Sequence, residues 1–217
     1  PYRRQRQMCI RDSYEIVEPA HGMLANGDMG DGRMPDEELL FEYIVKEIAF
    51  EKDMTGKKVL VTAGATLEAI DPVRFITNHS SGKMGFALAK NAMLRGAEVT
   101  LVMGKCDSEP PVFVNTVKVQ SAKDMYDAVI ERADSMDIIV KAAAVADYRP
   151  KNVSSEKVKK QDGNMSIELE RTDDILKTLG ERKNGQFICG FSMETENMLE
   201  NSRKKLEKKN CDMIVAN

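Results

Sequence analysis

A run of polar residues between an apolar segment and a helical pattern is the part of this sequence best suited to chemistry. The apolar run covers residues 59–64, and the helical pattern covers residues 83–95. The N–H groups of such a loop and the positive end of the following helix face the same point, which suits an anion. The sequence therefore predicts a phosphate or substrate loop consisting of Gly64, His79, Ser80, Ser81, Gly82 and Lys83.

Asn78 opens this loop, and its carboxamide could donate hydrogen bonds to a developing oxyanion. The hydroxyls and N–H groups that follow it could hold phosphate. A structural alternative is that Ser80 or Ser81 caps the helix, a role that serine often has, and both readings can hold together. His79 is as well suited to a hydrogen bond within the loop as to catalysis.

A second candidate segment reads Ala-Ala-Ala-Val-Ala-Asp-Tyr-Arg-Pro over residues 142–150 and is followed by a lysine-rich stretch. Small residues at the carboxyl end of a strand let a flat ligand lie against the backbone, where open α/β sheets bind ligands. Asp147 could accept from a ribose hydroxyl or a base, and Lys157 could pair with phosphates. The alternative is a packed alanine-rich strand followed by a solvated loop. The basic residues 203–205 and 208–209 mostly complement a helix dipole, although one or two could reach a triphosphate.

Composition excludes several classes of protein. The chain has 217 residues, a net charge of −3, four cysteines and two histidines. The charge provides no basic field for nucleic acid, and no run of about 18 apolar residues predicts a membrane span. The cysteines lack the spacing of a metal site or a disulfide framework. We therefore expect a cytoplasmic protein with no nucleic-acid or membrane partner.

Alternating strand and helix patterns from about residue 55 onward predict a Rossmann-like, doubly wound α/β domain with a mostly parallel sheet. A capping signature at Ser121 and Asp124 marks one helix start, and Gly96 is placed to end another helix. Met84, Met93, Met125 and Met198 are interpreted as core residues. The expected strands are 58–63, 98–103, 114–119, 137–142, 165–170, 186–192 and 212–216, and the expected helices are 83–95, 122–134, 173–182 and 196–209.

The segments before residue 55 differ from this pattern. Residues 1–13 contain four arginines and resemble translated sequencing-library adapter, so we expect them to be foreign or disordered; a basic arm is the alternative. Residues 14–34 are rich in glycine and predict a loop. Residues 35–38 then open a helix, with Pro35 in its first turn. Its apolar face contains Leu40, Tyr43, Ile44 and Ile48.

Taken together, these motifs resemble the phosphopantothenoylcysteine synthetase domain of the bacterial bifunctional phosphopantothenoylcysteine decarboxylase/synthetase family of coenzyme A biosynthesis. The resemblance runs from about Lys57 to Asn217, and it is most specific in DPVRFITNHSSGKMG, AAAVADYRP with EKVKK, GFSMET and CDMIVAN. Residues 14–34 resemble the tail of the preceding decarboxylase domain, so residues 14–54 are expected to form that tail plus a linker helix. Residues 55–217 are expected to form the synthetase domain.

The resemblance implies a ligase. The carboxylate of 4′-phosphopantothenate would attack the α-phosphate of CTP and release pyrophosphate, and the amine of L-cysteine would then displace CMP from the acyl-cytidylate. Mg²⁺ would neutralise the triphosphate. Asn78 matches the residue that stabilises the acyl-cytidylate, and the domain is expected to be a homodimer. The matching nucleotide contacts are Lys141, Ala142, Ala143, Asp147, Lys157, Asp173, Asp174, Ile175, Leu176, Phe191, Lys205 and Lys209.

Two departures from the family qualify this expectation. Asn26 stands where the decarboxylase motif commonly has a catalytic cysteine, so neither decarboxylation nor FMN binding is expected. The family also continues beyond Asn217, so we expect a C-terminally truncated domain. One alternative function is therefore a nucleotide-binding fragment without turnover. Another is an NAD(P)-dependent oxidoreductase, which would need a glycine fingerprint that the sequence lacks.

Overall fold

The structure is a computed structural model that describes residues 14–160, 164–193 and 196–216. The chain forms two compact units, one ending at Glu51 and one beginning at Lys52. Each unit is described here by itself. The predicted foreign segment, residues 1–13, lies outside the described residues.

The smaller unit begins with an antiparallel hairpin where the sequence predicted only a loop. Strand β1 (Ala20–Met23) pairs with β2 (Met29–Arg33). Gly27 forms the turn with a φ of 86°, so the expectation of positive-φ glycines is confirmed there. Across the pair, His21 Nδ1 and Asp31 Oδ1 lie 2.8 Å apart. The loop prediction was wrong because glycine-rich strands lack the alternation of apolar side chains by which strands are recognised.

Helix α2 (Glu37–Ile48) confirms the predicted helix of this unit. Asp36 is the N-cap residue, and Glu37 and Glu38 lie in the first turn, where carboxylates complement the helix dipole. Pro35 precedes the helix instead of occupying its first turn. None of the residues of α2 is buried, and Ile48 is 76% exposed. On the predicted apolar face, Leu40 and Tyr43 are half-buried among the described residues, whereas Ile44 and Ile48 are exposed.

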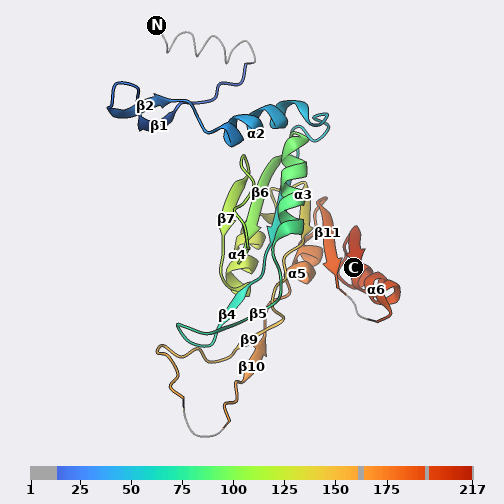
Figure 1. Ribbon diagram of the computed structural model, residues 1–217. Coiled ribbons are helices and arrows are strands. Elements are labelled where there is room, and N and C mark those ends of the chain that lie inside the picture. The colour runs from blue at the N-terminus through green and yellow to red at the C-terminus, as the bar shows by residue number, and fades with distance from the viewer. Residues whose placement is uncertain (1–13, 161–163, 194–195, 217) are drawn as a thin grey trace. The chain divides into compact units, whose positions relative to one another are not determined.

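The larger unit contains a sheet of six parallel strands (Figure 1). Numbered along the chain, its strands lie in the order 3-2-1-4-5-6, which is the doubly wound arrangement that the alternating pattern predicted. The order reverses between β3 and β8, and ligands bind such sheets outside the carboxyl ends at this point. Across the sheet the strands are β12 (Met213–Ala216), β11 (Phe187–Ser192), β8 (Ile138–Lys141), β3 (Lys58–Ala63), β6 (Glu98–Met103) and β7 (Asn115–Lys118).

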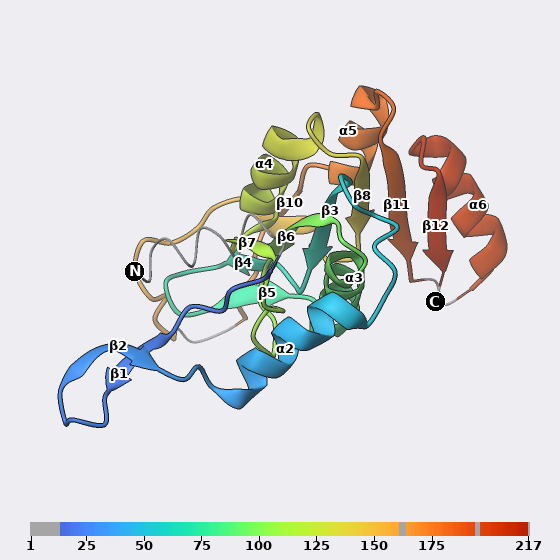
Figure 2. The same cartoon turned by 90° about the horizontal axis from the view of Figure 1, so that it is seen from above.

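Helices cover both faces of this sheet. Figure 2 shows α3 (Lys83–Leu94) on one face and α4 (Ala122–Ala133) and α5 (Ile175–Arg182) on the other. Helix α6 (Met198–Lys208) packs beside the edge strand β12. The core under α4 and α5 includes Leu60, Val102, Met125, Ile139, Ile175 and Ile188.

In the larger unit, the predicted helix ends are confirmed, but only two of the four methionines predicted to lie in the core are buried. Ser121 and Asp124 form the reciprocal capping box, and Gly96 follows α3 with a φ of 90°. Met93 and Met125 are buried, whereas Met84 and Met198 are exposed. The core interpretation is therefore wrong for the latter two, and Met84 instead contributes to the wall of a cleft.

Two short antiparallel ribbons lie beyond the carboxyl edge of the sheet (Figure 1). Strand β4 (Leu67–Ala69) pairs with β5 (Phe75–Thr77), and β9 (Tyr148–Pro150) pairs with β10 (Leu169–Arg171). The strand predicted at 165–170 is thus displaced to 169–171 and belongs to a ribbon, not to the main sheet. Three-residue strands are too short for a periodic pattern, and their pairing depends on partners distant in sequence.

Helix α3 crosses β3 closely enough that Gly85 leaves no room for a side chain. A Cβ at this position would lie 2.5 Å from Ala63 Cβ and 2.9 Å from the Thr62 carbonyl oxygen. We expect Gly85→Ala to lower the free energy of unfolding by roughly 1–3 kcal/mol because of this overlap. In a helix with free space at this position, the same change would raise the free energy of unfolding by about 1 kcal/mol. A decrease would therefore show that the close contact with β3 determines the effect. Urea unfolding measures it, with the exposed Ala87→Ser on the same helix as the control.

Candidate active site

A cleft of about 1580 Å³ lies at the carboxyl edge of the sheet, where the strand order reverses. Its walls come from the loop before α3, the segment after β8, the start of α5, the end of β11 and the C-terminal part of α6. Of the residues predicted from sequence, it brings together Asn78, His79, Ser80, Ser81, Gly82, Lys83, Lys141, Ala142, Ala143, Asp147, Asp173, Asp174, Ile175, Leu176, Phe191, Lys205 and Lys209.

Two predicted residues, Gly64 and Lys157, do not line this cleft. Gly64 has a φ of 78°, and a Cβ there would lie 2.4 Å from the Lys105 carbonyl oxygen. Its role in this structure is thus to permit a tight backbone crossing behind the loop. The side chain of Lys157 is exposed on the segment after β9.

Asn78 links two walls of the cleft. Its Nδ2 donates to the carbonyl oxygens of Ala144 at 3.4 Å and Val145 at 3.2 Å. The amide that the sequence directs toward an oxyanion is therefore engaged with the backbone after β8. Both contacts are long and Asn78 is exposed, so a bound substrate could compete for the same donor group.

The N-terminus of α3 is capped by glycine, not by serine. Gly82 is the N-cap residue with a φ of 78°, and α3 has no side-chain cap. Ser81 Oγ accepts from the Lys83 N–H only at 3.5 Å, and Ser80 Oγ accepts from the Gly82 N–H at 3.4 Å. The structural alternative of a serine cap is therefore wrong: glycine occupies the N-cap position, where a Cβ would meet Cys106 Sγ at 2.4 Å. The absence of a side-chain cap suits the helix start to an anionic ligand.

Two buried threonines and a half-buried one hold the segment after β8 in place. Thr62 Oγ1 accepts from the Ala143 N–H and Thr66 Oγ1 accepts from the Ala146 N–H, each at 3.0 Å. Thr172 Oγ1 donates to the Ala146 carbonyl oxygen at 2.6 Å. Sequence reasoning missed these positioning residues. The available signal was a single hydroxyl residue, Thr62, within the apolar run 59–64, because a polar group buried in a strand needs a hydrogen-bond partner.

Lysines from β8 and from the C-terminal part of α6 give the cleft its positive character. Burial lowers the pKa of Lys141 to about 8, with nearby Lys205 acting in the same direction and Asp174 opposing it. Lys205 Nζ donates to the Phe191 carbonyl oxygen at 2.9 Å, which ties α6 to the end of β11. Lys209 forms an ion pair with Asp174.

Asp174 has two structural partners besides its predicted role with a nucleotide. It is the N-cap residue of α5, where its Oδ1 accepts from the Lys177 N–H at 2.9 Å. Burial alone would raise its pKa, but the hydrogen bonds from Lys209 and from the Lys177 N–H outweigh burial and lower it. Asp174 therefore remains ionised next to the lysines at neutral pH.

Sequence reasoning also missed several residues of the cleft wall. Arg171 and Tyr148 are directly opposite each other in the β9–β10 ribbon, with the guanidinium 5.9 Å from the ring centroid. Lys105 Nζ lies 5.8 Å from the Phe75 ring centroid. A ribbon pairing is not visible in sequence, which is why these contacts were not expected. The additional wall residues include Lys105, Asp107, Tyr148, Arg171 and Met193.

Over the described ranges, no helix is both long and apolar enough to cross a bilayer. Within the same residues, no cluster of three or more histidine, cysteine, aspartate or glutamate side chains is arranged to hold a metal ion.

Comparison with known proteins identifies the family. The DNA/pantothenate metabolism flavoprotein C-terminal domain family matches residues 54–217. The chain is 47% identical over 218 residues to the coenzyme A biosynthesis bifunctional protein CoaBC of Bacillus subtilis, covering 99% of this chain and 54% of the relative. It is also 47% identical over 214 residues to the corresponding protein of Vibrio cholerae, covering 97% of this chain and 53% of the relative. It thus spans about half the length of these relatives.

A solved structure supports the same family assignment. The crystal structure of the C-terminal domain of a CoaBC protein superposes with a TM-score of 0.68 at 54% identity, covering 76% of this chain and 78% of the other. With the family match over residues 54–217, the conclusion is that this chain belongs to the DNA/pantothenate metabolism flavoprotein C-terminal domain family.

Proposed function

We propose that this chain is a CTP-dependent ligase that joins 4′-phosphopantothenate to L-cysteine in coenzyme A biosynthesis. The observation that carries the proposal is the cleft at the strand-order reversal, which combines a helix start without a side-chain cap and a group of lysines. Both features favour anions, so together they suit a nucleoside triphosphate and the carboxylate that it activates. The similarity to CoaBC proteins adds support.

In this proposal the nucleotide lies over the segment after β8. The small side chains of Ala142 and Ala143 leave space for a flat group against the backbone, and Asp147 accepts from the ribose or the base. Lys141, with Lys205 and Lys209 from α6, faces the triphosphate. Phe191 forms a wall for the base. The threonine hydrogen bonds from Thr62 and Thr66 keep this segment fixed before the ligand arrives.

The reaction proceeds in two displacements. A carboxylate oxygen of 4′-phosphopantothenate attacks the α-phosphorus of CTP, and the bond to pyrophosphate breaks. The cysteine amine then attacks the acyl carbon, CMP leaves, and the nitrogen loses a proton to give the amide. Asn78 stabilises the acyl-cytidylate by turning its amide donor from the Ala144 and Val145 carbonyls toward the reacting oxygen. The loop from His79 to Lys83 holds the substrate phosphate.

Magnesium fits this site as a companion of the triphosphate. Mg²⁺ is usually held by one or two carboxylates together with substrate phosphates and water, and the cleft wall offers Asp173 for this purpose. When bound, the ion would neutralise charge on the phosphates. The protein's own lysines hold and orient the remainder of the triphosphate.

The same proposal includes the organisation of the chain. Residues 14–54 correspond to the tail of a decarboxylase domain plus a linker helix, and residues 55–217 correspond to a synthetase domain that works as a homodimer in the cytoplasm. No FMN is involved in the reaction proposed for this chain.

Mass spectrometry of the chain with CTP, Mg²⁺ and 4′-phosphopantothenate, without cysteine, tests the proposal. We expect 4′-phosphopantothenoyl-cytidylate and pyrophosphate, and addition of cysteine should yield the amide and CMP. Saturable CTP binding without pyrophosphate release would instead indicate a nucleotide-binding fragment. Binding of NAD(P)H with no CTP binding would favour an oxidoreductase and would contradict the site assignment.

A further inference from the structure

The α6–β12 turn, residues 209–212, begins with Lys209, one of the lysines that line the cleft. The last hydrogen bond of α6 runs from the Lys209 N–H to the Lys205 carbonyl oxygen at 3.0 Å. Asn210 then adopts the left-handed conformation, with a φ of 50°, and its N–H donates to the Glu207 carbonyl oxygen at 3.1 Å. Asparagine is one of the few residues besides glycine that often end a helix in this way. The chain therefore turns away from α6 directly after the lysine.

The α6–β12 turn lies against the last turn of α5. Asn210 Nδ2 donates to the Gly180 carbonyl oxygen at 2.9 Å. The last carbonyl groups of a helix have no partner within it, so this bond satisfies a group that α5 leaves open. Gly180 is buried, and a Cβ there would overlap the Lys209 carbonyl oxygen. The absence of a side chain thus brings the two backbones into direct contact, and the Asn210 amide fixes that contact.

Asp212 holds the other end of the α6–β12 turn. Its Oδ2 accepts from the Ile188 N–H at 2.8 Å, and its own N–H donates to the Ile188 carbonyl oxygen at 3.0 Å. Its Oδ1 lies 2.6 Å from Lys183 Nζ, at the C-cap of α5. The turn is therefore bound to both α5 and β11, and its one contact from a side-chain amide is that of Asn210 with Gly180 among the described residues.

The Lys209 side chain extends from the α6–β12 turn to the wall of the cleft. It is only 15% exposed and forms an ion pair with Asp174, the N-cap residue of α5. A lysine ammonium group is carried on a flexible stem, so its position depends on how firmly its backbone and its partner are held. For Lys209 both are held by the same helix, the partner at the start of α5 and the backbone through Gly180.

We propose that Asn210 is a positioning residue for Lys209: its hydrogen bond to Gly180 holds the end of α6 on α5, and this anchor presents the Lys209 ammonium group to phosphates in the cleft. The proposal rests on the proposed function, in which Lys209 faces the triphosphate. Asn210 does not line the cleft, so its effect on a ligand passes through Lys209. Placing the lysine before the ligand arrives lowers the cost of ordering it on binding.

Asn210→Gly removes the anchor and keeps the backbone, because glycine adopts a φ of 50° without strain. Asn197→Gly is the matched control, since Asn197 precedes α6 with a φ of 49° and its side chain makes no capping hydrogen bond. Acylation of Lys209 by a small amine-reactive reagent is followed by peptide mass spectrometry. It should become about 2- to 10-fold faster in Asn210→Gly only, the value of one neutral hydrogen bond. An unchanged rate would overturn the proposal.

A double-mutant cycle on CTP affinity tests the connection to the cleft. Dissociation constants are measured for the wild type, Asn210→Gly, Lys209→Met and the double variant. We expect Asn210→Gly to weaken CTP binding about 2- to 10-fold, because an anchor contributes no more than its own hydrogen bond. The double variant should bind within about twofold of Lys209→Met alone. If the two effects instead multiply, Asn210 acts by another route and the proposal fails.

Lys141 provides the comparison that a merely structural role would not pass. This lysine comes from β8, which is held by β3 and β11, so the α6–β12 turn does not place it. The effects of Asn210→Gly and Lys141→Met on CTP affinity should therefore multiply to within about twofold. Coupling of Asn210 to both lysines would show that the whole lysine group shifts and would contradict a specific role toward Lys209.

The acylation rates require no nucleotide, so the inference and the proposed function can fail separately. A wild type that binds CTP but releases no pyrophosphate would contradict ligation alone, and the cycle would still decide the role of Asn210. A wild type that binds no CTP would overturn both. If Asn210→Gly does not fold, Asn210→Asp replaces it, since aspartate tolerates the left-handed backbone but has no N–H group for the Gly180 carbonyl oxygen. The same acylation and coupling results are then expected.

Discussion

Replacing Asn78 by aspartate should lower the rate of ligation by about 10²–10³-fold, the usual effect of losing an oxyanion donor. Aspartate has nearly the same shape but no N–H group, and its carboxylate would face the Ala144 and Val145 carbonyl oxygens that Asn78 now contacts. A negative charge there would also repel an acyl-cytidylate. The measurement is the steady-state rate of amide formation, with thermal unfolding to show that the fold persists.

Asn115→Asp is the matched control, because Asn115 is exposed at the start of β7 and does not line the cleft. It should retain the wild-type rate. An Asn78→Asp variant that ligates as fast as the wild type would show that the amide has no part in the chemistry.

Replacing Lys141 by methionine should weaken CTP binding by roughly 10–150-fold at pH 7, the value of one hydrogen bond to a charged group. The pKa of Lys141 is lowered by burial to about 8, so this side chain is protonated at pH 7 and loses its charge as pH rises through 8. Wild-type affinity should therefore fall between pH 7 and 9, whereas that of the variant should change much less. Isothermal titration calorimetry over this range measures both, with the exposed Lys208→Met as the control.

The lowered pKa of Lys141 also predicts how the free energy of unfolding changes with pH. Its pKa is lower in the folded than in the unfolded chain, so the unfolded chain binds more protons between pH 8 and the ordinary lysine value. The free energy of unfolding should therefore rise with pH in this window, and Lys141→Met should remove that rise. An affinity profile equally steep in the variant and the wild type would exclude Lys141 as the titrating group.

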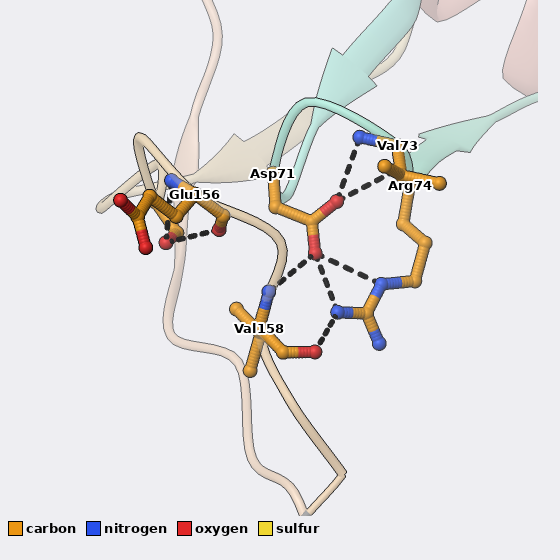
Figure 3. A network of polar contacts seen from close by, with 6 residues as sticks. Asp71, Val73, Arg74, Glu156 and Val158 are labelled. Carbon is orange, nitrogen blue, oxygen red and sulfur yellow. Dashed lines mark hydrogen bonds and ion pairs between the residues drawn. The ribbon is translucent and has the colours of Figure 1, made fainter.

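The parallel sheet could be predicted from sequence because strands such as β3, β6 and β11 are short, mostly apolar runs and helical patterns recur between the strands. The boundaries of β3 and β6 agree with the predicted runs 58–63 and 98–103. The ribbons could not be predicted in the same way. Strands β4 and β5 are three residues long with one polar residue each, and Asp71 and Arg74 build the turn between them (Figure 3).

Site residues that are recognised by their type could be predicted from the sequence. Residues that reach the site only because two distant strands pair could not. Lysines, small residues and polar loops are visible in a sequence, so residues from Asn78 to Lys209 could be proposed before the cleft was seen. Thr62 escaped notice because a threonine in a strand usually reflects β-propensity, and Thr66 because it lies in the short connection between β3 and β4. Arg171 entered the wall only because β10 pairs with β9.

The strand order of the main sheet has a consequence for assembly of the molecule. Strand β3 is central, paired with β6 on one side and with β8, nearly 80 residues further along the chain, on the other. One wall of the cleft follows β3 and the other follows β8 and β11, so the pocket exists only after both halves have docked on the central strand. Such distant pairings form late and slowly. A ligand that spans the reversal point therefore stabilises the docked state by mass action, and its presence should retard unfolding of the half that carries β8, β11 and β12.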